Sequence, residues 1–217
     1  MYTRRVKYRT LFFDLDDTLY TKQSGIWEAL RHRIEAYMHE RVGIPEMDVP
    51  RVRETYLGKY GTTLQGLLAN HAIDADDYME YVHDVPIEEM ISPNKPLAEM
   101  LARLPQRKWV FTNSSKAHSS RVLRVLGIDN QFEGILDSKA MGYRSKPQAD
   151  LYELALRSAG DPSPSGSVFI DDKWENLAPA KGLGAATVIV GNGRNPKADY
   201  SIERVEDLLK AFPALVE

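Results

Sequence analysis

The feature that most constrains the fold is a series of short apolar runs, each followed by polar residues and a helical pattern. The runs are TLFF at 10–13, WVF at 109–111, GIL at 134–136, VFI at 168–170 and ATVIV at 186–190. Continuous apolar runs are typical of buried parallel strands, and strands that alternate with helices indicate crossover connections. The sequence therefore predicts an α/β fold with a doubly wound, Rossmann-like parallel sheet.

A long block without strand patterns separates the first apolar run from the second. From about Lys22 to Met90 the pattern is helical, and it predicts about four helices with breaks at Gly43, Pro50, Gly61 and Asp74. Because this block interrupts the strand series, we interpret it as an insertion. The predicted domains are a core made of residues 1–20 and 92–217, and an all-helical domain made of residues 21–91.

Composition limits the possible partners and location of the protein. The chain has 217 residues, 43% of them hydrophobic and 27% charged, with no cysteine. No apolar run approaches the roughly 20 residues that a membrane span needs, and the first residues lack the apolar stretch of a secretory signal. The net charge of −3 gives no overall basic field for nucleic acid polymers. We therefore expect a cytoplasmic enzyme without a membrane or nucleic acid partner.

Two acidic clusters follow predicted strands. Asp14, Asp16 and Asp17 come directly after the first, and the pair Asp171–Asp172 follows VFI. Each cluster has a plain structural reading, as a solvated turn or as a helix cap. Loops at the carboxyl ends of adjacent parallel strands share one crevice, however, and crowded carboxylates repel one another unless a cation lies between them. Together the clusters predict a divalent metal site.

Polar residues after the other strands could bind an anion at the same crevice. Thr112, Asn113 and Ser114 follow WVF, and Lys146 precedes Pro147 at a predicted helix start. Taken alone, Asn113 or Ser114 is placed to cap the next helix, and a single lysine is usually solvated. Combined with the carboxylates, these residues supply a nucleophile, an acid–base group, metal ligands and an anion clamp. Phosphoryl transfer requires this set of groups.

Four segments resemble the motifs of the haloacid dehalogenase (HAD) superfamily in the same order: FFDLDDTLY, FTNS, Lys146–Pro147 and FIDDKWEN. The resemblance implies Asp14 as the nucleophile and Asp16 as the general acid and base. It implies Mg²⁺ bound by the Asp14 carboxylate, the Asp16 backbone carbonyl and a fourth-motif aspartate. Asp172 is favoured for that ligand, with Asp171 and Asn176 holding metal-bound water. Asp171 stays open as the direct ligand.

The resemblance also implies that Thr112, Asn113 and Lys146 hold the phosphate oxygens and that the helical insertion is a cap over the site. Within the superfamily, three features resemble the pyrimidine 5′-nucleotidase branch: the tyrosine after DxDxTL, the segment YGTTLQGLLANHAIDADDYMEYVHD and the segment FTNSSKAHSSRVLRVLGI. A pyrimidine nucleoside monophosphate is then the expected substrate. Its base would lie near cap residues such as Tyr60, Gly61 or Leu64.

The remaining aromatic side chains and histidines have ordinary structural interpretations. His71, His83 and His118 lie on helical patterns without metal-ligand partners at usable spacing, so we expect surface or hydrogen-bonded positions. Trp27 and Tyr37 are interpreted as packing within the helical block.

Four alternatives stay open from the sequence. The same chemistry could act on sugar phosphates or other small metabolites, or a phosphomutase could pass the phosphoryl group to another hydroxyl. Hydrolysis of a carbon–halogen bond is disfavoured by Asp16 and the Asp171–Asp172 pair, which that reaction does not need. A non-catalytic protein of the same fold could have lost Asp14, Asp16 or Lys146, but all are present. Apolar faces of the cap are compatible with a monomer or a homodimer.

Overall fold

The core of the protein is a six-stranded parallel sheet. The computed structural model describes residues 7–191 and 193–216. Within them the strand order is β3-β2-β1-β4-β5-β6, and all neighbouring pairs are parallel. The strands are β1 (Thr10–Phe13), β2 (Arg107–Phe111), β3 (Gly134–Leu136), β4 (Ser167–Asp171), β5 (Ala186–Val190) and β6 (Tyr200–Ile202). This confirms the predicted parallel sheet.

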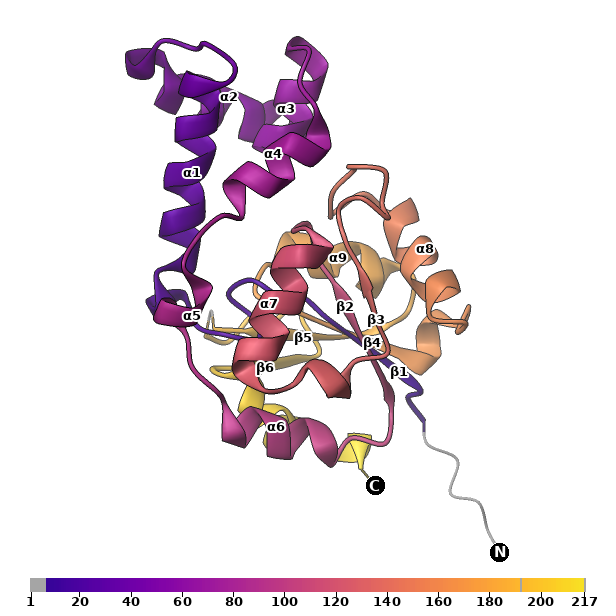
Figure 1. Cartoon of the computed structure of the whole chain (residues 1–217). Helices are drawn as coiled ribbons and strands as arrows, with labels where there is room; N and C mark the ends of the chain where they lie inside the picture. The colour runs from indigo at the N-terminus through magenta and orange to yellow at the C-terminus, as the bar shows by residue number, and fades with distance from the viewer. Residues whose placement is uncertain (1–6, 192, 217) are drawn as a thin grey trace, which may run out of the picture.

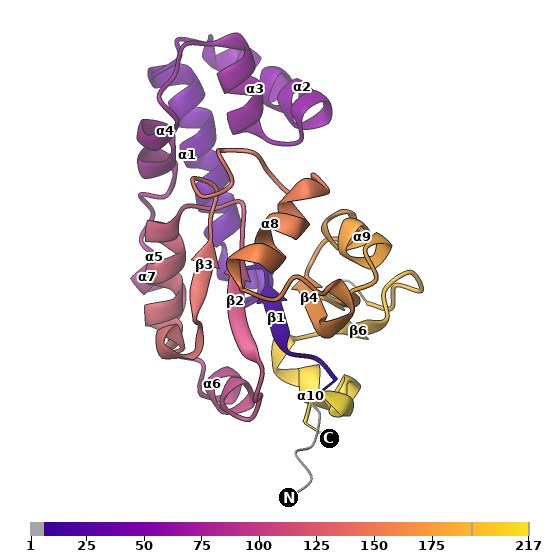
Figure 2. The same cartoon turned by 90° about the vertical axis from the view of Figure 1, so that its right-hand side faces the viewer.

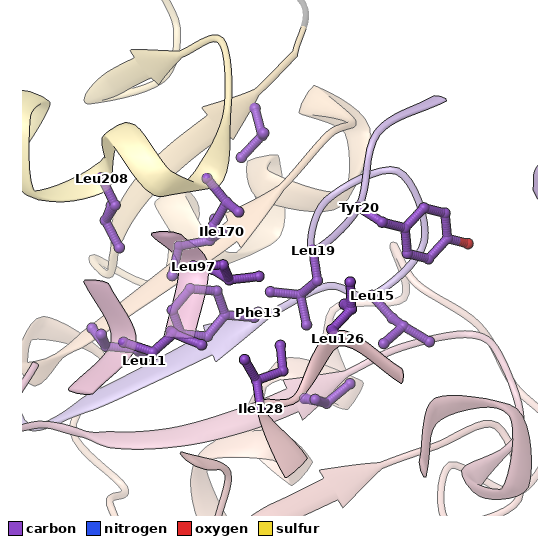
Figure 3. Close-up of a cluster of buried hydrophobic side chains, with 14 of the residues drawn as sticks. Leu11, Phe13, Leu15, Leu19, Tyr20, Leu97, Leu126, Ile128, Ile170 and Leu208 are labelled. Carbon is purple, nitrogen blue, oxygen red and sulfur yellow. The ribbon is translucent and has the colours of Figure 1, made fainter. Parts of the chain in front are cut away.

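Helices cover both faces of the sheet (Figure 2). One face carries α5 (Ile87–Met90), α6 (Lys95–Ala102), α7 (Lys116–Leu126) and α10 (Leu208–Ala211), and the other carries α8 (Asp150–Ser158) and α9 (Trp174–Gly182). The alternate side chains of β1 separate accordingly: Leu11 and Phe13 belong to the first hydrophobic cluster, and Phe12 belongs to the second. Figure 3 shows Leu11 and Phe13 in the first cluster, with Leu97, Ile170 and Leu208 around them.

The inserted helices are α1 (Ile26–Glu40), α2 (Val49–Tyr60), α3 (Thr63–Asn70) and α4 (Ala75–Val82), and they stand together above the sheet (Figure 1). They agree with the four predicted helices. They have a hydrophobic cluster of their own, which includes Met38 and Leu67. The first turns of α1 pack with the core cluster instead, through Ile26 and Leu30. The division at residues 21 and 91 stays a proposal.

The cap contacts a core loop that follows β3. Asp76, at the start of α4, accepts hydrogen bonds from Lys139 Nζ at 2.7 and 2.9 Å and from the Tyr143 hydroxyl. The Gln65 side chain of α3 donates to the Tyr143 carbonyl. These contacts join the cap to the core on one side of the space between them.

Some predicted details were wrong. The N-cap of α7 is Ser115, whose hydroxyl accepts from His118 N at 3.3 Å, and neither Asn113 nor Ser114 has that role. The strand β6 and the helix α6 were not predicted. Short 3₁₀ turns complete the described secondary structure at Lys22–Ser24, Glu46–Asp48, Asp129–Gln131, Pro164–Gly166, Val205–Asp207 and Pro213–Leu215. No helix among the described residues is both long and apolar enough to cross a membrane.

The strand order changes direction between β1 and β4. The chain adds β2 and β3 on one side of β1, then returns to build β4, β5 and β6 on the other. Phe13 pairs with Val110 on one side and Ile170 on the other, so the residues that follow these strands lie at one edge. Ligands bind at such a switch point, beyond the carboxyl ends of the strands.

Candidate active site

Asp14 is the first residue beyond β1 and lies at this switch point. Its N–H donates to the Ile170 carbonyl at 2.8 Å, which extends the β1–β4 ladder by one bond. The side chain is buried, with 9% of the residue exposed, and Thr18 Oγ1 lies 3.4 Å from its Oδ2. The backbone ladder therefore fixes the position of a buried carboxylate at the bottom of the crevice.

Lys146 joins the first and fourth motifs. Its buried ammonium donates to Asp14 Oδ1 at 2.7 Å and to Asp171 Oδ2 at 2.7 Å. Asn113 holds the lysine backbone, because its Oδ1 accepts from Lys146 N at 2.8 Å and its Nδ2 donates to the Lys146 carbonyl at 3.4 Å. A buried ammonium held this way can neutralise charge on a phosphate placed beside Asp14.

Three buried carboxylates form a group that could hold a metal ion. Asp14, Asp171 and Asp172 each offer an oxygen, and these oxygens lie within 4.8 Å of one another. Burial raises the pKa of Asp14 to about 8; Lys146 opposes this rise, and Asp171 and Asp16 add to it. Three carboxylates are thus buried around the buried ammonium of Lys146. An all-oxygen, anionic donor set of this kind fits Mg²⁺.

The two adjacent aspartates of the fourth motif have different surroundings. Asp171 accepts from Lys146, from Lys173 N at 2.9 Å, and from Asn176 Nδ2 at 3.0 and 3.2 Å. Asp172 lies 3.2 Å from the partly exposed Lys22 ammonium. Because donors already engage both oxygens of Asp171, the geometry supports Asp172 as the direct metal ligand. The assignment of either residue stays a prediction.

Asp16 lies in a ring of hydrogen-bond donors. Tyr20 Oη and His118 Nε2 approach its Oδ1 at 2.5 and 3.0 Å, and Ser114 Oγ approaches its Oδ2 at 2.5 Å. Burial raises the pKa of Asp16, but the His118 ring and the hydrogen bonds from His118, Ser114 and Tyr20 outweigh burial and hold it well below its usual range. These surroundings favour the carboxylate form of Asp16, which accepts the three hydrogen bonds.

The loop after β2 has a different arrangement from the anion cradle expected there. Thr112 Oγ1 accepts from Ser114 N at 3.0 Å, Ser114 donates to Asp16, and the Asn113 side chain binds the Lys146 backbone. All three residues nevertheless line the cavity above Asp14. Their contact with phosphate stays a prediction, and the structure adds a role for Asn113 and Ser114 in holding Lys146 and Asp16.

A cavity of about 350 Å³ lies between the carboxylates and the cap. Its apolar wall includes Trp27, Leu57 and Leu64, and its one Arg or Lys from residues 21–91 is Arg53. Arg53 is 15% exposed, its Nη1 lies 3.9 Å from Glu35, and its buried Nε has no hydrogen-bond partner in the described part of the chain. The cavity has the size and mixed character of a small-molecule site.

Sequence comparison now identifies the family. A sequence model of haloacid dehalogenase-like hydrolases matches residues 8–184, which is most of the chain. The chain belongs to the haloacid dehalogenase-like hydrolases. The expectation of a HAD-type enzyme is thereby confirmed, whereas the pyrimidine nucleotidase branch stays a proposal.

Curated relatives of this HAD-like hydrolase include proteins with differently named activities. "Phosphate metabolism protein 8" of Saccharomyces cerevisiae is 29% identical over 83% of this chain and 61% of its own length. "Tyrosine-protein kinase PtkA" of Mycobacterium tuberculosis is 27% identical over 88% of this chain and 64% of its own. "Glyceraldehyde 3-phosphate phosphatase" of Methanocaldococcus jannaschii is 22% identical over 92% and 94%. The chain thus spans less than two thirds of the length of the first two.

Solved structures confirm the fold. A HAD phosphatase from Thermococcus onnurineus superposes with a TM-score of 0.65 at 18% identity, covering 93% of this chain and 96% of that one. At this identity the likeness concerns the fold alone. The family model supports a hydrolase, and phosphatase activity stays a proposal.

Two aromatic side chains in the cap of this HAD-like hydrolase differ in their surroundings. Tyr37 is buried between Tyr78 and Tyr81 and donates to Asp77 at 2.9 Å, as expected of a packing residue. The interpretation of Trp27 as packing was wrong, because it is 41% exposed and lines the cavity.

The cap residues proposed to lie near the base do not all line the cavity. Gly61 and Leu64 line the cavity. Tyr60 is not among the lining residues, and its hydroxyl accepts from Asn70 Nδ2 at 3.1 Å. The proposed contact with the base therefore gains support for Gly61 and Leu64 alone.

Sequence reasoning missed His118 and Arg53 as site residues. His71 is hydrogen-bonded to Tyr56 at 2.8 Å and His83 to the Met79 carbonyl at 2.7 Å, as expected for satisfied positions. His118 is also hydrogen-bonded, but its partner is Asp16. The available signal was its place in the first turn of the helix that follows the second motif, because that turn begins at the edge where the motifs meet.

Proposed function

We propose that this HAD-like hydrolase is a magnesium-dependent phosphomonoesterase that works through an aspartyl-phosphate on Asp14, with pyrimidine nucleoside monophosphates as substrates. The observation that carries the proposal is the buried Lys146, which contacts Asp14 and Asp171 at 2.7 Å beside the carboxylate group. This arrangement combines a carboxylate nucleophile with positive charge for the phosphate oxygens.

The reaction has two steps at Asp14. An Asp14 oxygen attacks phosphorus, the ester P–O bond breaks, and Asp16, which must be protonated before this step, gives its proton to the departing oxygen. A water molecule then attacks the aspartyl-phosphate, Asp16 takes its proton, and phosphate and the Asp14 carboxylate are released. Mg²⁺, held by Asp14, Asp172 and the Asp16 carbonyl, would supply a positive charge for the transferring phosphoryl group. Lys146 donates to the phosphate oxygens throughout.

The cap cavity supports a substrate with a flat, partly apolar leaving group. Its wall offers the Trp27 ring and Leu64, and Arg53 offers donors to oxygen atoms of a ligand. A pyrimidine base has an apolar face and carbonyl acceptors, so it fits these groups. The likeness of the cap sequence to the pyrimidine 5′-nucleotidase branch supports the same class, whereas the relative named for phosphate metabolism supports only a phosphate-related role.

A phosphatase for small phosphorylated metabolites is the second candidate. It is favoured by the alignment with "Glyceraldehyde 3-phosphate phosphatase", which extends over 94% of that relative. Phosphomutase activity would need the same Asp14 and Lys146, with a sugar hydroxyl in place of water. Carbon–halogen hydrolysis is less well supported, because it does not require the buried group of three carboxylates. A non-catalytic protein of this fold would not need Asp14, Asp16 and Lys146 together, and all three are present.

The test is phosphate release from a panel of nucleoside and sugar monophosphates, with Mg²⁺ or with chelator, and with Asp14→Asn as the blank. We expect selective, Mg²⁺-dependent release from UMP or CMP. Release from other esters would show that the substrate belongs to another class, while the aspartyl-phosphate mechanism would still hold. Release that persists in the Asp14→Asn blank would refute the mechanism itself.

A further inference from the structure

The two oxygens of Asp16 are engaged unequally. Oδ1 accepts from both Tyr20 Oη and His118 Nε2, whereas Oδ2 accepts from Ser114 Oγ. A carboxylate oxygen has two lone pairs directed in its plane. Two donors therefore occupy Oδ1, and Oδ2 keeps one lone pair for a further proton. Asp16 thus has one oxygen with two donors and one oxygen with a single donor.

His118 reaches Oδ1 from inside the protein. Its side chain is 0% exposed, and a carboxylate cannot donate, so the proton of this hydrogen bond belongs to Nε2. Nδ1 of His118 is buried without a hydrogen-bond partner among residues 7–191 and 193–216. The ring has no other polar contact in that part of the chain, so its visible role is directed at Asp16.

The cap packs directly on this histidine. The His83 ring, one residue after α4, lies 4.5 Å from the His118 ring between centroids, with an interplanar angle of 35°. His83 is fixed in turn, because its Nδ1 contacts the Met79 carbonyl at 2.7 Å. Burial lowers the pKa of His83 to about 3, and His118 adds to this, so His83 is a neutral packing partner. The cap therefore covers one side of the His118 ring through His83.

We propose that His118 is a positioning residue for Asp16: together with Tyr20, it fixes Oδ1 so that Oδ2 is the oxygen that exchanges the proton with the leaving group and the water. The inference rests on the proposed role of Asp16 as acid and base. Tyr20 comes from the loop after β1, where Figure 3 shows its ring beyond Leu15 and Leu19, and His118 comes from α7. Two elements thus hold one carboxylate from different directions.

The experiment uses leaving groups of different acidity. Departure of p-nitrophenolate needs little help from an acid, whereas departure of an alkoxide from UMP, or from whichever alkyl phosphate proves to be the substrate, depends on one. kcat/KM reports steps up to formation of the aspartyl-phosphate. We would measure it for both esters in the Mg²⁺-loaded wild type, His118→Leu and His118→Gln, with thermal unfolding of each.

We expect His118→Leu to lower kcat/KM for the alkyl phosphate by roughly tenfold or more, and that for p-nitrophenyl phosphate by less than about threefold. His118→Gln should recover most of the loss, because its amide can donate to Oδ1. His71→Leu is the matched control, since it removes a hydrogen-bonded histidine away from Asp16 and should leave the ratio of the two values unchanged.

Equal losses for both esters in His118→Leu, or no loss, would overturn the inference. If that variant does not fold, Tyr20→Phe removes the other donor to Oδ1 and should shift the ratio in the same direction. Asp16→Asn distinguishes the acid role of Asp16 from the positioning role of His118. If Asp16→Asn shows no leaving-group dependence, the acid role of Asp16 fails; if it does and His118→Leu does not, the positioning role alone fails.

Discussion

At the scale of single residues, the site depends on contacts between charged groups that are buried together. Lys146 is 4% exposed and compensates two carboxylates at once. Burial lowers the pKa of Lys146, but Asp14 and Asp171 outweigh burial and hold it above its usual range. The two carboxylates therefore favour the charged form of the lysine, and removing either partner would leave buried charge uncompensated.

Asp14→Asn should lower phosphate release by at least roughly a thousandfold, because the amide cannot form the covalent intermediate. The measurement is single-turnover phosphate release in Mg²⁺. Thermal unfolding of the variant in chelator shows whether it is folded. A folded variant with near-normal turnover would mean that Asp14 is not the nucleophile.

Metal binding provides a test that does not depend on activity. Mg²⁺ that binds the folded chain should raise the unfolding temperature, by more the more tightly it binds, and chelator should reverse the shift. We expect Asp172→Asn to lose most of this shift and Asp171→Asn to keep part of it, because Lys146, Lys173 and Asn176 already engage Asp171. The opposite order would assign Asp171 as the direct ligand.

At the scale of elements, short strands are positioned by side chains at their ends as well as by the ladder. β1 has four residues. Asp161, in the loop before β4, is hydrogen-bonded to residues at the start of β1. Asp161 accepts from Arg9 at 2.6 and 3.2 Å and from Thr10 Oγ1 at 3.1 Å. This contact fixes β1, and hence Asp14, along the direction of the strand.

Asp161→Asn should therefore destabilise the fold by about 1–3 kcal/mol at pH 7, the range for hydrogen bonds to a buried charged group. Burial raises the pKa of Asp161, but the bonds from Arg9 and Thr10 outweigh it and hold the pKa below its usual range. A lowered pKa contributes stability above the unfolded value near 4, and the contribution is lost as the pH falls through the folded value.

Urea unfolding at pH 7 and below pH 4 measures this effect. The difference between wild type and Asp161→Asn should shrink at the lower pH. Glu153→Gln, which removes an exposed pair with Arg157, is the control and should change stability by less than about 0.5 kcal/mol. A difference that does not depend on pH would show that the charge of Asp161 is not what stabilises β1.

Sequence patterns predicted the elements that position the site. The apolar runs before Asp14, Thr112 and Asp171 are strands, and the helix after the second motif ends at Gly127 with a φ of 73°, as its residue type indicates. The pattern missed β6, because its sequence, Tyr-Ser-Ile, is interrupted by a polar residue and is not a continuous apolar run. The pattern misplaced the N-cap residue of α7 by one or two positions, since three neighbouring polar side chains could each accept the same hydrogen bonds.

At the scale of the whole molecule, the proposed function divides the work: the core would supply the chemistry, and the cap would supply the wall around the leaving group. The two parts meet through Asp76 and Lys139 and through the His83 and His118 rings, which are tilted by 35° to each other. Phosphate would lie against core residues, while Arg53 and Leu64 belong to the cap. Changes in the cap should therefore alter substrate choice more than the reaction at phosphorus.

Arg53→Met keeps the apolar stem of the side chain and removes its donors. We expect KM for a nucleoside monophosphate to rise by roughly tenfold or more, the effect of losing a charged hydrogen bond. kcat/KM for p-nitrophenyl phosphate should change by less than about threefold. Arg51→Met, on the same helix but 71% exposed, is the control. Equal behaviour of the two variants would show that Arg53 does not contact the substrate.

The sequence by itself determined the parallel sheet, the inserted helices and the motif residues at the strand ends, because strand burial and helix periodicity are local properties. Only the tertiary structure decided which side chains meet there. Asp16 contacts His118 across 102 residues of chain, and the choice between Asp171 and Asp172 depends on which one faces Lys146. Side-chain direction and long-range contact have no local pattern, since they depend on how separate elements pack.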